Sequence, residues 1–403
     1  MKLNAPRFRH AGPARVAKAC GLWPALTILV LISLPAANSL AQGGRANINA
    51  SATFDSDGVL WAVDATPEHV RVRRSKDFGG NWSEAVVVNP EPEPVSATGD
   101  SRPKIAVGGD GELYVTWTRP LERPFTGEIR FSRSLDQGRS WSPPITVHAD
   151  RQQITHRFDA IEVTKDGRIF IAWIDKRDLE LAKAADQPYR GAAVYFAVSD
   201  DRGASFRGDY RLTEHSCECC RIATQADGDG VLAFWRHIFE PNIRDHALAR
   251  MNPDGSSGPT HRATFDQWAV DACPHHGPSL AIDDRDQLHA VWFTLGPENS
   301  GVFYGRLERG GAPIARRRIG GERAEHADIA VAGSEIALVW REFNGAGMQL
   351  WGSRSSDRGQ TWSDTLLATT TNQSAQPQLL VRNGRFHAYW HTLEEPHRVL
   401  TLP

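Results

Sequence analysis

The sequence predicts an all-β chain folded as a β-propeller, and three observations support this fold class. A short apolar pattern returns seven times, a turn-forming pattern occurs four times, and no long segment shows helical periodicity. The composition, 40% hydrophobic and 23% charged, is that of a globular protein. One hydrophobic core serves roughly 250–300 residues at most. A chain of 403 residues is therefore expected to contain either two domains or a repeat architecture, and the repeats favour the second.

The first 41 residues have the organisation of an export signal. They carry five basic residues and no acidic one, and an apolar run follows at residues 25–34. Ser39 and Ala41 place small side chains at the −3 and −1 positions of a cleavage site before Gln42. The apolar run is shorter than the roughly 20 residues that span a membrane. We expect residues 1–41 to be a signal peptide, the protein to be periplasmic or extracellular, and no stable membrane insertion after cleavage.

The nearly neutral net charge hides an acidic body. The whole chain has 46 basic and 48 acidic residues, but without residues 1–41 the count is 41 against 48, a net charge of −7. An acidic protein is repelled by the phosphates of nucleic acids and by anionic lipids. Nucleic acid is therefore not expected as a partner.

The repeated unit consists of a β-branched run, a turn that often contains Asp-Gly, and an apolar strand that ends in Trp. Clear copies are residues 104–117 and 161–173, and later copies end at Trp235, Trp292, Trp340 and Trp390. An earlier copy, residues 52–64, has Asp64 where the others have Trp. The tryptophans follow one another at intervals of 48 to 62 residues, which is typical of propeller blades. The sequence thus contains seven units.

A second pattern, S-x-D-x-G-x-x-(W/F), follows the first in four units. The copies are Ser75–Trp82, Ser134–Trp141, Ser199–Phe206 and Ser355–Trp362. Ser and Asp side chains bond back to the backbone of a turn, and Gly adopts the left-handed conformation that a tight hairpin requires. The aromatic residue is expected to pack beneath the next strand.

These turns resemble Asp-boxes, the bacterial neuraminidase repeats, and the chain from about residue 45 to 403 resembles the sialidase superfamily. The resemblance implies a single sialidase-like propeller of four-stranded blades over residues 42–403. Sialidases have six blades, whereas seven units are counted here, so we favour seven blades and keep six as the alternative. The last unit offers three strands, and a strand near residues 45–49 would complete it.

Alternation of strand direction predicts which loops form a functional face. The loop entering the first strand of each blade and the loop joining its second and third strands lie on one face, and the Asp-box turns lie on the other. Five arginines fall in the two kinds of loop on the predicted functional face: Arg102, Arg157, Arg221, Arg236 and Arg341. Guanidinium groups bind carboxylate, phosphate or sulfate in a bidentate manner. We therefore expect these arginines to bind a small anionic or glycan ligand, although each could instead form a structural salt bridge.

The resemblance to sialidases also implies an activity. Members use an arginine triad, a Tyr–Glu nucleophile pair and an Asp acid/base, and they carry an F/Y-R-I-P signature before the first Asp-box. The nearest match is Ser101–Pro103, which lacks the Ile and follows the first box. No tyrosine stands in a recognisable nucleophile context. A sialidase-like exo-glycoside hydrolase with a diverged site therefore remains the alternative function.

Cysteine and histidine residues gather in the loops that enter two consecutive blades. One loop carries Cys217, Cys219 and Cys220, and the other carries Cys273, His275 and His276. Three interpretations remain open: disulfides between the loops, a nucleophilic Cys paired with one of the histidines, and a site for copper or zinc. The favoured function is an exported binding or accessory protein for a soft metal ion or an anionic ligand, and a protein partner is a further alternative.

Overall fold

The computed structural model describes residues 48–272 and 274–403. The predicted signal peptide lies outside the described residues, and so does Cys273. Within the described part, no helix has the length and apolar character needed to cross a membrane.

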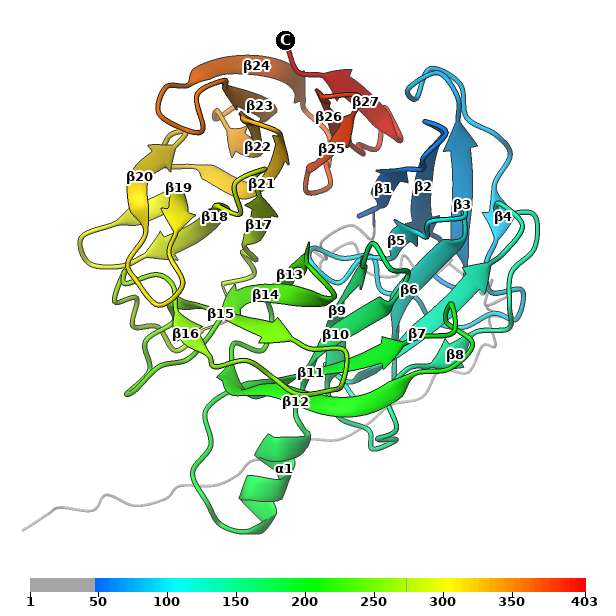
Figure 1. Ribbon diagram of the computed structural model, residues 1–403, viewed down its shortest axis with the longest axis vertical. Coiled ribbons are helices and arrows are strands. Elements are labelled where there is room, and N and C mark those ends of the chain that lie inside the picture. The colour runs from blue at the N-terminus through cyan, green and yellow to red at the C-terminus, as the bar shows by residue number, and fades with distance from the viewer. Residues whose placement is uncertain (1–47, 273) are drawn as a thin grey trace, which may run out of the picture. The chain divides into compact units, whose positions relative to one another are not determined.

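Seven antiparallel sheets follow one another along the chain and form a ring (Figure 1). The first three blades are β1 (Ser51–Phe54), β2 (Leu60–Ala65), β3 (Val70–Ser75) and β4 (Val86–Val87); β5 (Lys104–Val107), β6 (Leu113–Pro120), β7 (Gly127–Ser134) and β8 (Ile145–Thr146); and β9 (His156–Val163), β10 (Ile169–Asp175), β11 (Ala192–Ser199) and β12 (Arg207–Ser216). The next two are β13 (Ala223–Asp227), β14 (Gly230–Arg236), β15 (His246–Met251) and β16 (His261–Arg262); and β17 (Ser279–Ile282), β18 (Leu288–Leu295), β19 (Ser300–Leu307) and β20 (Ile314–Ile319). The last two are β21 (Ala324–Ala332), β22 (Glu335–Phe343), β23 (Met348–Ser355) and β24 (Ser363–Thr370); and β25 (Gln378–Arg382), β26 (Arg385–Trp390) and β27 (Arg398–Thr401).

The seven-bladed prediction is confirmed, and the first strand of each blade lines the centre of the ring (Figure 1). Six blades have four strands, and the seventh has three within the described residues. Residues 48–50 are not in a strand, and residues 45–47 lie outside the described part. The strand expected near residues 45–49 therefore does not complete the seventh blade within the described residues.

The hydrophobic core is divided into seven clusters, each lying between two neighbouring blades. Six repeat tryptophans, at the positions the sequence pattern marks, are among the largest fully buried side chains: Trp117, Trp173, Trp235, Trp292, Trp340 and Trp390. The alternating side chains of each sheet pack against the adjacent sheet, as in other stacked β-structures. This explains why a chain of this length needs no single large core.

The ring closes between the last blade and the first. Leu380 and Tyr389 of the seventh blade share a buried cluster with Ala52 and Leu60 of the first. The backbone N–H of Ala52 also donates to the side chain of Gln378 at 3.0 Å. Closure by side-chain packing protects the edges that an open array of sheets would expose.

The four S-x-D-x-G segments adopt the hairpin that the sequence predicts between the third and fourth strands. In the second blade, the Ser134 hydroxyl donates to Asp136 at 2.8 Å and accepts the Gly138 N–H at 2.8 Å. Gly138 has a φ of 75°, and a Cβ there would lie 2.9 Å from Trp61 of the preceding blade. Glycine thus serves both the turn and the close approach of adjacent blades. The four aromatic residues pack partly buried against the inter-blade clusters.

One helix interrupts the β-structure. The sequence places helical character near residues 178–185, and α1 (Arg177–Ala184) lies in the connection between β10 and β11. Asp178 in its first turn accepts a hydrogen bond from the Tyr195 hydroxyl at 2.8 Å, which ties the helix to the blade.

Candidate functional site

Three cysteine side chains meet in the connection between the third and fourth blades. The Cys217 and Cys219 sulfurs are 3.8 Å apart, and those of Cys219 and Cys220 are 3.9 Å apart. All three sulfurs lie within 4.8 Å of one another, and each residue is at most 4% exposed. The connection leaves β12 at Ser216 and enters β13 at Ala223, so it crosses from the outer strand of one blade to the inner strand of the next. This crossing buries the sulfurs in the apolar cluster between the two blades.

Arginine side chains surround the cysteine cluster, by which we mean Cys217, Cys219 and Cys220. The Arg244 guanidinium donates from Nη1 to the Cys217 sulfur at 3.3 Å. Hydrogen bonds from the thiols of Cys219 and Cys220 lower the pKa of Cys217 well below its usual range, and the charges of Arg236 and Arg244 act in the same direction. Hydrogen bonding to Cys217 and burial raise the pKa of Cys220. The cluster is therefore arranged to hold negative charge on Cys217.

The sulfur separations concern disulfides within the cysteine cluster, because a disulfide between the two loops would involve Cys273. A disulfide bond joins two sulfurs at about 2.05 Å. The separations of 3.8 and 3.9 Å are those of neighbouring thiols, so Cys217 and Cys219 are not joined to each other, and neither are Cys219 and Cys220. The predicted contribution of Cys273 lies outside the described residues.

Four of the five predicted arginines donate to backbone carbonyls, and three of these are Arg102, Arg221 and Arg236. Arg102 donates to the Gln376 carbonyl at 3.1 Å, and Arg221 donates to the carbonyls of Pro278 and Ala327 at 2.8 and 2.7 Å. Arg236 donates to the His276 carbonyl at 2.9 Å. These arginines tie together segments of different blades, both adjacent blades, as in Arg221 with Pro278, and blades that are not adjacent, as in Arg102 with Gln376. Burial and the nearby charge of Arg221 lower the pKa of Arg102.

Arg157 interacts electrostatically with one of the cysteines, Cys219. Its side chain stacks over the Phe158 ring at 5.0 Å. Burial lowers its pKa, and the charge of Cys219 acts in the opposite direction. Arg157 thus supplies a third positive charge beside the cysteine cluster, in addition to Arg236 and Arg244.

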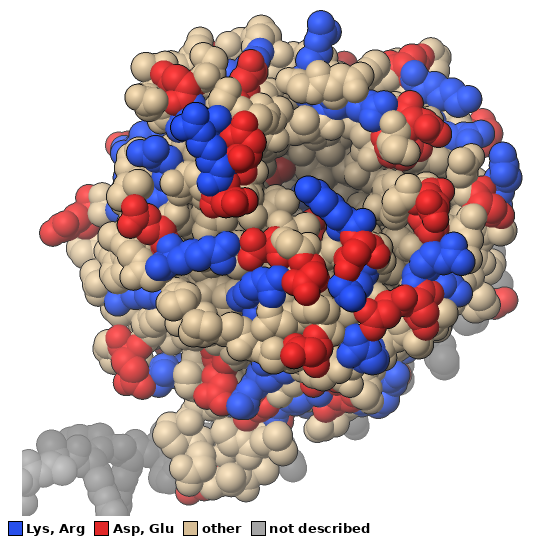
Figure 2. All heavy atoms as spheres, in the orientation of Figure 1, with Lys and Arg blue, Asp and Glu red and all other residues tan. Residues whose placement is uncertain are grey.

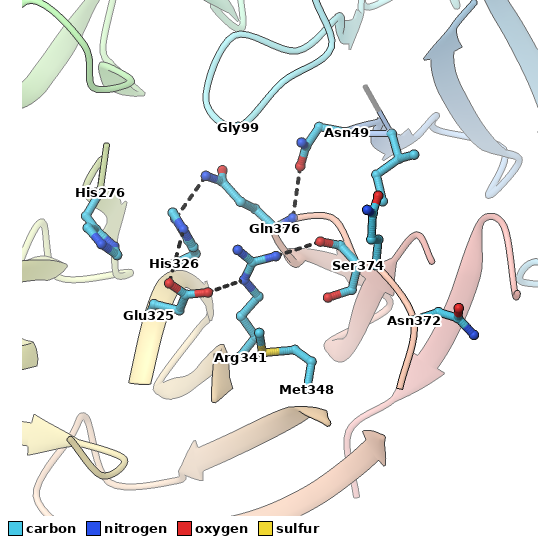
Figure 3. Close-up of a pocket in the computed structure, with 12 residues that line it drawn as sticks. Asn49, Gly99, His276, Glu325, His326, Arg341, Met348, Asn372, Ser374 and Gln376 are labelled. Atoms are coloured by element: carbon cyan, nitrogen blue, oxygen red, sulfur yellow. Dashed lines mark hydrogen bonds and ion pairs between the residues drawn. The ribbon is translucent and has the colours of Figure 1, made fainter. Parts of the chain in front are cut away.

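The remaining predicted arginine, Arg341, lines a cavity of about 410 Å³ at the centre of the ring (Figure 3). Its Nε lies 2.8 Å from Glu325, and its Nη1 donates to the Ser374 carbonyl at 2.6 Å. His276 and His326 also line this cavity, and their rings stack with centroids 4.6 Å apart. The structure therefore places Arg341 in the cavity, Arg102 and Arg221 in loops that enter blades, and Arg157 and Arg236 at the ends of β9 and β14.

The two predicted histidines have different surroundings. His276 belongs to a set of possible ligand atoms with Glu325 and His326, all within 4.8 Å of one another. His275, with a φ of 55°, is half-buried in the same loop. The loops of the two clusters are tied together by Asp100, whose carboxylate accepts the N–H groups of Arg221 and Gly277 at 3.2 and 3.1 Å.

Sequence reasoning missed Arg244, Glu325 and His326 as site residues. Arg244 lies in a connection between the second and third strands, a loop class that the strand alternation assigns to this face. Glu325 and His326 lie near the start of the inner strand β21, beside cavity residues such as Gly99, His276 and Gln376 from the loops that enter other blades. Each of the three lies at a position of its repeat that belongs to the predicted functional face, and this position is the signal that could have identified them.

On the face turned to the viewer in Figure 2, basic and acidic side chains intermingle around a central hollow. Several of these charges form ion pairs, such as Arg250 with Asp227 at 3.2 Å.

Known structures share the fold of this chain. An α-L-arabinofuranosidase from Fusarium graminearum in complex with arabinobiose has a TM-score of 0.50 and 11% identity, covering 88% of this chain and 92% of that one. A mutant α-L-arabinofuranosidase from the same organism, in complex with an iminosugar inhibitor, has a TM-score of 0.50 and 11% identity, covering 74% and 91%. The Trypanosoma rangeli sialidase in complex with the inhibitor DANA has a TM-score of 0.46 and 12% identity, covering 89% and 55%. No protein-family model and no curated protein matches the sequence. At these identities the likeness is one of fold.

Proposed function

We propose that this protein is an exported binding protein for copper(I), which it holds through Cys217, Cys219 and Cys220. The observation that carries the proposal is the meeting of three buried sulfurs within 4.8 Å of one another. Thiolates are soft ligands, and copper(I) is the soft ion among the biological first-row metals. Zinc in structural sites takes four ligands in a tetrahedron, so the three sulfurs that the described residues bring together favour copper(I) over zinc.

The surrounding charges support the same assignment. Copper(I) bound by three thiolates has a net charge of about −2, which is costly to bury without compensation. Arg236 and Arg244 lower the pKa of Cys217, and Arg157 interacts with Cys219. Three guanidinium groups therefore balance the charge of a loaded cluster.

The binding proposal is tested by titrating copper(I) into the full chain under anaerobic conditions, against a chromophoric copper(I) chelator. We expect one tightly bound copper per chain. Changing Cys217, Cys219 or Cys220 to Ser should weaken binding by at least tenfold. The control is Met348→Leu, which removes a thioether from the central cavity and should leave binding unchanged. Wild-type affinity in all three Ser variants, or a disulfide within the cluster of the native protein, would overturn the proposal.

The glycoside hydrolase alternative would place its chemistry in the central cavity. Glycosidases generally need two carboxyl groups, about 5 Å apart for retention and roughly 6.5–9.5 Å apart for inversion. The described residues lining the cavity include one carboxylate, Glu325, which is paired with Arg341. We therefore rank binding above hydrolysis. Release of a fluorophore from a sialoside or an arabinofuranoside by wild type, and its loss in Glu325→Gln, would reverse this ranking.

A further inference from the structure

A second group of metal-ligating side chains lies in the central cavity, separate from the cysteine cluster. His276 comes from the loop that enters the fifth blade, and Glu325 and His326 begin the inner strand of the sixth. One ligand atom from each of these three lies within 4.8 Å of the other two. We propose that His276, Glu325 and His326 form a site for a divalent metal ion of borderline softness, such as zinc, with open coordination positions that face the cavity.

The type of donor supports a different metal from that of the cysteine cluster. Two imidazoles and one carboxylate suit zinc and iron(II), whereas they lack the thiolates that select copper(I). Zinc–nitrogen bonds are about 2.0–2.1 Å, so neighbouring ligands in a tetrahedral site lie roughly 3.3 Å apart. The present separations, up to 4.8 Å, require a closure of no more than about 1.5 Å on binding.

Neighbouring side chains hold these donors in place. Arg341 approaches one oxygen of Glu325 at 2.8 Å, and the other oxygen lies 3.6 Å from the His326 ring (Figure 3). The Gln376 side-chain nitrogen lies 2.9 Å from Nδ1 of His326, and Nε2 lies on the side of Glu325. Ligation through Nε2 requires a proton on Nδ1, so the Gln376 amide would turn its oxygen toward Nδ1 when the metal binds. Gln376 is itself fixed, because its backbone N–H donates to Asn49 at 3.0 Å. Such supporting contacts orient the ligands of metal sites and tune their affinity.

The backbone and the ring packing also fix the two histidines. His326 has a φ of 52° and lies where the pairing of β21 with β22 shifts register between Glu325 and Asp328. A bulge of this kind redirects a side chain out of the regular alternation of a strand. His276 stacks on Phe293 with ring centroids 4.0 Å apart. His326 is therefore presented to the cavity by a strand, and His276 by a loop residue whose ring packs on Phe293.

The cavity gives the site an open side for a second ligand. Its lining includes the amides of Asn49, Asn372 and Gln373 and the hydroxyl of Ser374. Three protein ligands leave a position for an exogenous group, as in catalytic zinc sites. Arg341 already balances the charge of Glu325, so a divalent ion adds positive charge that favours an anionic ligand. A small polar anion, such as a carboxylate, is the class of ligand that this arrangement fits.

Cobalt(II) titrated alone into the full chain tests the site, since its visible spectrum reports the ligands. We expect one cobalt(II) with d–d bands and no sulfur-to-cobalt charge-transfer band. Glu325→Gln and His326→Ala should each weaken binding by at least tenfold. Glu298→Gln, which changes an exposed carboxylate outside the cavity, should not.

The readouts separate this inference from the copper proposal. Near-UV circular dichroism verifies that each variant is folded. If His326→Ala perturbs the core, Glu325→Gln still tests the site, because it preserves the shape of the side chain. Unchanged cobalt affinity in a folded Glu325→Gln variant, or a charge-transfer band from thiolate, would overturn the second site. Failure of copper binding with these cobalt results intact would overturn the cysteine proposal alone.

Discussion

Arg244 points its guanidinium at the sulfur of Cys217, with Nη1 3.3 Å from Sγ, although the two residues lie on different connections. Arg244 is also fixed from the other side, because its Nε donates to the Val270 carbonyl at 3.1 Å. A charged donor held in this way favours the thiolate of Cys217 over the thiol. The packing of the blades therefore brings a charged hydrogen-bond donor to one of the proposed copper ligands.

Replacing Arg244 by Gln should weaken copper(I) binding by about 10- to 100-fold, the range found when supporting contacts of metal ligands are removed. The reason is that the Cys217 thiolate loses a charged donor while the three sulfurs remain. Competition with a copper(I) chelator measures the change. Arg151→Gln, at an exposed position, is the control and should bind like wild type. Equal affinities for Arg244→Gln and wild type would show that the guanidinium does not support the site.

Glu162 should make the stability of the propeller depend on pH. Its side chain reaches from β9 to Thr224 of β13, whose hydroxyl donates to it at 3.3 Å, and burial raises its pKa from 4.5 to about 7. The folded state then binds more protons than the unfolded state between these values, so stability falls as pH rises from about 4.5 to 7. Glu162→Gln should remove this dependence.

The measurement is urea unfolding of Glu162→Gln and wild type at pH 4 and pH 8. Relative to wild type, the variant should gain up to about 3 kcal/mol between the two pH values, the equivalent of the pKa difference. Glu84→Gln changes an exposed carboxylate and should show no such gain. An identical pH profile for Glu162→Gln and wild type would contradict the expected ionisation.

Ser134 should be a structural residue of the propeller rather than part of a site. Its buried hydroxyl donates to Asp136 and accepts from Gly138, so Ser134→Ala removes a donor to Asp136 and leaves the Gly138 N–H without this acceptor. We expect a loss of about 1–3 kcal/mol in the free energy of unfolding, with copper(I) affinity unchanged. Chemical denaturation and chelator competition test both parts, with exposed Ser363→Ala as control. A loss of copper binding in folded Ser134→Ala would argue against a purely structural role.

Trp173 should stabilise the packing of the third blade. Its indole N–H donates to Asp175 at 2.8 Å, and both side chains are fully buried. Trp173→Phe removes the hydrogen bond and leaves a gap beside a carboxylate, which should cost about 2–3 kcal/mol of unfolding free energy. Leu181→Ala on α1, at a position 63% exposed, should change stability little. Equal denaturation midpoints for Trp173→Phe and wild type would contradict this role.

Local patterns in the sequence are sufficient for the repeating parts of this molecule. The number of blades follows from the spacing of a repeated strand that in most copies ends in Trp, such as Trp173. Each of these tryptophans must be buried against a neighbouring blade. The turn at Ser134 follows from hydrogen bonds between residues four or fewer positions apart. Such interactions depend on neighbouring residues alone, and sequence reasoning can therefore predict them.

The candidate sites depend on contacts between residues that are far apart in the sequence, and local sequence patterns do not predict such contacts. The nearness of Cys217, Cys219 and Cys220 follows from their spacing, but Arg244 reaches them from another connection because two blades pack side by side. His276 and His326 are separated by 50 positions and meet because successive blades direct their first strands to the centre of the ring. The sequence by itself determined a seven-unit propeller with clustered cysteines. Only the tertiary structure decided which arginines lie near the sulfurs, because ring closure sets the distances between loops of different blades.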